Sequence, residues 1–180
     1  MGNALLYEGT STPDSIPAQL ICTLPMTSAL ATSPVAPSAT VAPSIAPIAP
    51  WSDDYLTGDG LIDAQHKNLF HLVNELHALM QQGTTSMAIK RRLEELVACT
   101  TAHFDMEEER MEALGYPNLA AHCKRHTALK ERIQLALDKV NQGNGVIPLD
   151  VSICLSEWMI HHIKGEDQRM IQFFRTFDQP

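Results

Sequence analysis

The chain has 180 residues, enough for one domain with a hydrophobic core plus an extension, and its formal net charge is −8. An acidic balance with no basic cluster argues against binding to nucleic acid or to anionic membranes. No run of about 18 apolar residues exists, so the sequence predicts no membrane span.

Residues 1–50 have the composition of a low-complexity tail. Eight of the eleven prolines fall here, together with two acidic residues and no Lys or Arg. Proline at this density prevents a packed helix, so we predict a flexible, disordered tail rich in Pro, Ala and Ser. Because this tail has little patterned apolar surface, a protein that begins near Pro50 is expected to keep its fold and site. The absence of a secretory-signal pattern predicts a cytoplasmic protein with reduced cysteines.

Residues 51–180 carry four segments with the apolar period of amphipathic helices. Gly83, Gly115 and Gly143 follow the first three segments, in the position typical of glycines that end helices. The expected helices cover approximately residues 62–80, 86–114, 119–142 and 149–176. Short connections force antiparallel neighbours, so we predict an all-α, up-down-up-down four-helix bundle.

Each expected helix carries histidine or carboxylate residues toward the same end of this bundle. They are His66 in the first helix, His103 and Glu107 in the second, His122 and His126 in the third, and His162 in the fourth. Residues four apart share one helical face, so the pair His122 and His126 can bind one ion. Imidazole combined with carboxylate suits iron, and the number of ligands suits two ions.

The carboxylate of the fourth helix is ambiguous from spacing alone. At 100° per residue, Glu166 lies about 40° around the axis from His162, and Asp167 lies about 140° away. Simple helical geometry favours Glu166. The apolar face, however, is centred between His162 and Asp167, so these two residues could straddle it. Spacing leaves both candidates open.

The count of ligands predicts one vacant coordination position. Five imidazoles, two bridging carboxylates and one solvent-derived bridging oxygen leave a pair of six-coordinate irons one bond short. The vacancy falls on the iron that has fewer histidines. A small ligand such as O2 would bind there, which favours a binding or redox site over a closed structural one.

Residues 51–180 resemble the hemerythrin family, specifically the bacteriohemerythrins. The segments that carry the resemblance are Ile62-Asp63-Ala64-Gln65-His66-Lys67, His103-Phe104-Asp105-Met106-Glu107-Glu108, His122-x-x-x-His126 and Trp158-x-x-x-His162-Ile163-x-x-x-Asp167. The resemblance implies a non-haem di-iron site with an oxo or hydroxo bridge. It also implies a carboxylate five residues after the last histidine, which selects Asp167.

Carried over residue by residue, the resemblance assigns each predicted ligand a role. One iron is expected on His122, His126 and His162, and the other on His66 and His103, with Glu107 and Asp167 bridging the two. His77 shares the face of His66 but lies about 16 Å along the helix, too far to bind the same ion. Glu108 and Glu109 are expected to form a solvated face.

The function that the resemblance implies is reversible O2 binding, as a carrier, store or delivery protein and not as an enzyme. O2 is the expected partner, with an oxygen-consuming enzyme or a reductase as a further one. The alternatives are an O2 or redox sensor module, a ferritin-like di-iron oxidase, and a scavenger of nitric oxide or peroxide. Ferritin-like sites use Glu-x-x-His pairs, and this sequence contains none.

Overall fold

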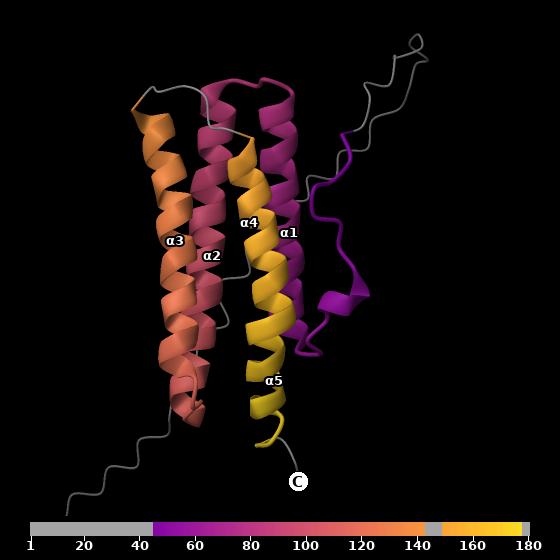
Figure 1. Cartoon of the computed structure of the whole chain (residues 1–180), viewed down its shortest axis with the longest axis vertical. Coiled ribbons are helices and arrows are strands. Elements are labelled where there is room, and N and C mark those ends of the chain that lie inside the picture. Colours follow the sequence, from indigo (N-terminus) through magenta and orange to yellow (C-terminus); the bar gives the residue numbers. More distant parts are fainter. Residues whose placement is uncertain (1–44, 143–148, 178–180) are drawn as a thin grey trace, which may run out of the picture. The chain divides into compact units, whose positions relative to one another are not determined.

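The protein is an all-α four-helix bundle, as predicted (Figure 1). The structure is a computed structural model that describes residues 45–142 and 149–177, so residues 1–44 of the predicted tail (residues 1–50) lie outside the described residues. No strand occurs in these two ranges. The elements are η1 (Asp53–Tyr55), α1 (Gly60–Gln81), α2 (Ser86–Leu114), α3 (Leu119–Asn141), α4 (Asp150–His162), η2 (Ile163–Asp167) and α5 (Gln168–Phe174).

Local capping interactions set the ends of the first two helices. The Asp59 carboxylate accepts hydrogen bonds from the backbone N–H groups of Leu61 and Ile62, and so begins α1. The Thr85 hydroxyl caps α2 in the same way. Gly115 ends α2 in the left-handed region, at φ 67°, where glycine is favoured. Short turns therefore return the chain antiparallel to itself after α1 and after α2.

The apolar core is divided into two clusters along the bundle. The larger one includes Leu69, Phe104 and Met159. The smaller one closes the end of the bundle and consists of Ile62, Met111, Tyr116, Met170, Ile171 and Phe174. Along the helices, the predicted ligands lie where the larger cluster gives way to the smaller one. The polar residues therefore form one layer with apolar packing on both sides.

Residues 45–59, which we call the N-terminal arm, pack against the bundle (Figure 1). The backbone of Ala49, which is fully buried, is hydrogen-bonded twice to the Asn74 side chain, N–H to Oδ1 at 2.9 Å and C=O to Nδ2 at 2.8 Å. Trp51 makes edge contacts with Tyr55 and Phe70. The buried Asp63 carboxylate accepts a 2.7 Å hydrogen bond from the Thr57 N–H. The predicted boundary at residue 50 therefore falls inside a continuous set of contacts.

These contacts change what is expected from truncation. Removing residues 1–50 should lower the free energy of unfolding by about 1–3 kcal/mol relative to removing residues 1–44, because the half-buried Asn74 amide loses two hydrogen bonds. Urea denaturation of the two truncated proteins measures the difference. Asn74→Ala should destabilise the longer protein but have little further effect on the shorter one. Equal stability of the two proteins would contradict this role for Ala49.

Candidate metal centre

The structure brings all seven predicted ligands into one buried cluster. They form two overlapping groups, one of His122, His126, His162, Glu107 and Asp167, and one of His66, His103, Glu107 and Asp167. Within each group the potential ligand atoms lie within 4.8 Å of one another. Only the two carboxylates belong to both groups. The cluster therefore has the composition of two metal positions that share two carboxylates.

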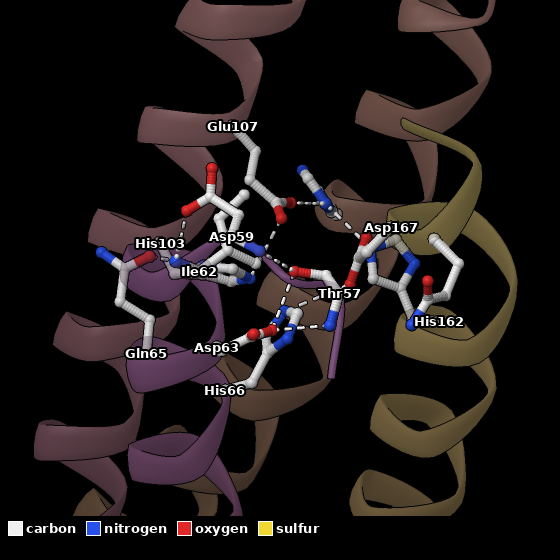
Figure 2. Close-up of polar contacts among 12 residues, drawn as sticks. Thr57, Asp59, Ile62, Asp63, Gln65, His66, His103, Glu107, His162 and Asp167 are labelled. Atoms are coloured by element: carbon white, nitrogen blue, oxygen red, sulfur yellow. Dashed lines mark hydrogen bonds and ion pairs between the residues drawn. The ribbon is translucent and has the colours of Figure 1, made fainter. Parts of the chain in front are cut away.

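Each carboxylate directs its two oxygens toward different histidine groups (Figure 2). Glu107 Oε1 lies 3.5 Å from His103 Nε2, and its Oε2 lies 3.4 Å from His126 Nε2. Asp167 Oδ2 lies 3.3 Å from His66 Nε2, and its Oδ1 lies 3.0 Å from His162 Nε2. This is the arrangement that a carboxylate needs in order to bridge two ions.

A π-helical turn places Asp167, rather than Glu166, in the cluster. Residues Ile163–Asp167 form η2, and the Gln168 N–H donates to the Ile163 carbonyl, five residues back. The wider turn brings residues five apart onto one face, so Asp167 follows His162. Glu166 points outward instead, with Oε1 2.7 Å from Arg169 Nη2 and 3.0 Å from Arg125 Nη2. The regular helical wheel favoured the wrong carboxylate because it assumes an uninterrupted α-helix.

The buried polar atoms of the cluster are suited to metal ions. In the described parts of the chain, both ring nitrogens of His66 and His122, and both oxygens of Glu107 and Asp167, form no hydrogen bond of proper geometry, although they lie close to one another. Leaving buried polar groups unpaired costs roughly 1–3 kcal/mol each, so a site with eight such atoms is explained by ligands that bind there. Imidazole and carboxylate donors fit iron. The residues thus fit the predicted metal.

In the metal-free protein, burial and the charges of neighbouring groups shift the pKa values of these residues in different directions. Burial, followed by the charge of Asp167, raises the pKa of Glu107 to about 8. Burial alone would lower the pKa of His122, but Asp167 and Glu107 outweigh it and raise the pKa to about 9. Burial, followed by the charge of His66, lowers the pKa of His103 to about 3. At neutral pH, Glu107 and His122 therefore hold protons that a metal ion must displace.

Metal uptake is therefore expected to strengthen with pH. Below the raised pKa values of Glu107 and His122, each bound ion competes with protons, so apparent affinity should rise about tenfold per pH unit for each proton displaced. The rise should flatten as the pH passes about 8 and 9, where these groups lose their protons. Titration of the metal-free protein with Fe2+ under argon, with proton release recorded, measures the effect. Affinity that is independent of pH would contradict it.

Two outer contacts were missed in the sequence. Glu108, expected on a solvated face, lies with its Oε1 2.8 Å from His126 Nδ1. Gln65 Oε1 lies 2.9 Å from His103 Nδ1. The sequence offered one signal for these contacts, since Gln65 directly precedes the ligand His66 and Glu108 directly follows the ligand Glu107.

His77 lies outside the cluster, as predicted. Its Nδ1 lies 2.9 Å from Ser152 Oγ, and its Nε2 lies 2.7 Å from Gln81 Nε2. These contacts satisfy a buried histidine within the core and leave no nitrogen free for a metal ion.

A bundle with a shared, histidine-rich and carboxylate-bridged site defines a class of non-haem metal proteins, and comparison with known sequences identifies the family. The family model described as Hemerythrin HHE cation binding domain matches residues 57–174. The chain belongs to the hemerythrin family, and this membership implies binding of non-haem iron.

Individual relatives agree with this assignment. The chain is 34% identical to a bacteriohemerythrin of Stenotrophomonas maltophilia over 66% of this chain and 76% of that protein. It is 36% identical to one of Pseudomonas aeruginosa over 69% of this chain and 80% of that protein. A crystal structure of wild-type hemerythrin, 29% identical, matches with a TM-score of 0.63 over 67% of this chain and 92% of that chain. In the described ranges, no helix is long and apolar enough to cross a membrane.

Proposed function

We propose that this protein binds O2 reversibly at a pair of non-haem irons and serves to carry, store or deliver it in the cytoplasm, without acting as an enzyme. The observation that carries the proposal is a small apolar cavity beside the cluster. Its volume is about 20 Å³, and its walls include Leu69, Val73, Leu96, Leu129, Leu155 and Met159. It has room for a molecule of the size of O2 and offers few hydrogen-bond partners to a water molecule.

The cavity adjoins the metal position that has fewer histidines. Both histidines of that position, His66 and His103, line the cavity, whereas only His162 does so from the other group. The coordination count places the vacant position on the same side. The number of ligands and the shape of the cavity therefore both support this location for a small apolar ligand.

Aromatic side chains hold the ligand rings and exclude water. Phe104 stacks on His126 with ring centroids 3.6 Å apart, and Trp158 stacks on His162 at 4.3 Å. Both aromatic residues also line the cavity. When bound, the iron pair would supply the electrons for O2 binding. An apolar wall slows the access of protons and water that would end a reversible cycle, which favours holding O2 over activating it.

The test is an optical titration of the iron-loaded full chain. The protein is reduced with dithionite under argon, freed of excess reductant, exposed to O2 and then returned to argon. We expect an oxygenated spectrum that appears and disappears repeatedly, with one O2 bound per two irons. Continuous O2 consumption with a reductant present would support an oxidase instead. A single irreversible oxidation with no oxygenated species would also refute the proposal.

A further inference from the structure

Two of the five clustered imidazoles are fixed from outside the cluster, one in each group. His126 Nδ1 faces Glu108 Oε1 at 2.8 Å, and His103 Nδ1 faces Gln65 Oε1 at 2.9 Å. For His66, His122 and His162, Nδ1 has no hydrogen-bond partner within residues 45–142 and 149–177. Each metal position therefore has one histidine whose Nδ1 is held by a side chain outside the cluster.

Both contacts select the same ring tautomer. A carboxylate or amide oxygen accepts a hydrogen bond, so Nδ1 must carry the proton, and Nε2 is left with a free lone pair. In both histidines Nε2 is the nitrogen that faces Glu107, at 3.5 Å for His103 and 3.4 Å for His126. The outer contacts thus present the correct nitrogen to each metal position before any ion binds.

The two acceptors differ in charge. Glu108 is a carboxylate whose side chain is 29% exposed, and within the described ranges no Lys or Arg forms an ion pair with it. The His126 side chain is fully buried. Gln65 is a neutral amide. A hydrogen bond to an ionised acceptor is roughly twice as strong as a neutral one, and it increases the electron donation of the imidazole to its metal.

We infer that Glu108 and Gln65 are positioning residues that make the two metal positions electronically unequal. Glu108 stabilises the ferric state at the position of His122, His126 and His162. Gln65 fixes His103 without adding charge, so the position that borders the cavity remains the easier one to keep ferrous. This inference rests on the proposed di-iron function and adds to it the residues that tune its redox balance.

The chain provides matched variants for a test. Glu108→Gln keeps the shape of the side chain but removes its charge, and Gln65→Glu adds the charge at the other histidine. Glu109→Gln is the control. Glu109 is the exposed neighbour of Glu108, so this substitution removes the same charge at a residue that contacts no ligand. Each full-length protein is loaded with iron and titrated with a redox mediator under argon, with electron paramagnetic resonance spectra recorded on half-reduced samples.

At a fixed potential, Glu108→Gln should raise the ferrous-to-ferric ratio about tenfold, because the hydrogen-bond acceptor of His126 loses its negative charge. Gln65→Glu should lower the ratio, and Glu109→Gln should change it less than about twofold because solvent screens an exposed charge. The resonance signal of half-reduced protein should change in the first two variants and not in the control. A purely structural role would alter iron content without this opposite shift.

The inference is wrong if Glu108→Gln shifts the ratio no more than Glu109→Gln does, or if Gln65→Glu shifts it in the same direction as Glu108→Gln. Should Glu108→Gln fail to retain iron, the direction of the Gln65→Glu shift still decides. The titration needs iron but no O2, so it is separate from the test of function. A protein that fails to bind O2 reversibly yet shows the opposite shifts would refute the function and keep the inference.

Discussion

Asp167→Asn is expected to strip iron from the protein, whereas Glu166→Gln should leave the iron content unchanged. Asp167 is fully buried and directs one oxygen to each histidine group. An amide offers one neutral oxygen in place of two anionic ones, so it cannot bridge two ions with the same charge. We expect apparent iron affinity to fall more than about 100-fold, which exceeds the loss typical for a residue that only hydrogen-bonds to a metal ligand.

Glu166→Gln is the matched control because it makes the same chemical change one residue earlier. The Glu166 carboxylate contacts Arg169 and Arg125 rather than the cluster. Loss of these ion pairs should change the free energy of unfolding by about 1 kcal/mol or less. Iron per chain, measured after loading and desalting, separates the variants. Iron loss in Glu166→Gln with retention in Asp167→Asn would show that the π-helical turn does not form.

His122→Ala is expected to lose both iron and stability, whereas His77→Ala should lose only stability. His122 Nε2 lies 3.3 Å from Asp167 Oδ1, within the three-histidine group. An ion that binds only the folded state stabilises it by about 4 kcal/mol when its free concentration is 1,000 times Kd. Removing this ligand should abolish most of that stabilisation, because metal binding and folding are coupled.

His77→Ala removes a buried histidine of the same size from the same bundle. It disrupts the contacts with Ser152 and Gln81, so we expect a loss of about 1–3 kcal/mol that does not depend on iron. Denaturant unfolding with and without iron distinguishes the two effects. If stability of the His122→Ala protein still responds to iron as the unchanged protein does, then His122 is not a ligand.

The ends of the helices were predictable because they depend on local chemistry. The second helix begins at Ser86 and stops before Gly115 in both the sequence pattern and the structure. Thr85 and Gly115 interact with backbone groups only a few residues away, so the sequence alone shows where the helix begins and ends. The shared depth of the ligands was predictable for a similar reason, since short turns fix the order and direction of the helices.

The features that could not be predicted depend on contacts between helices. Whether Glu108 meets solvent or the ring of His126 is decided by side-chain direction across the interface between α2 and α3, and composition does not encode it. The N-terminal arm shows the same limit. Ala49 carries no signal of burial in a proline-rich segment, yet the position of Asn74 on α1 fixes its backbone.

The π-helical turn also governs how the far end of the bundle is closed. Leu155 and Met159, which precede the turn, belong to the larger apolar cluster, and Met170 and Phe174, which follow it, belong to the smaller one. The turn contains one residue more than an α-helical turn, so it sets the rotation of α5 about its own axis. In a straight α-helix of the same sequence, Met170 and Phe174 would be rotated by roughly a quarter of a revolution from the directions they have here. The turn that aligns Asp167 with His162 therefore also orients the side chains that seal the end of the bundle.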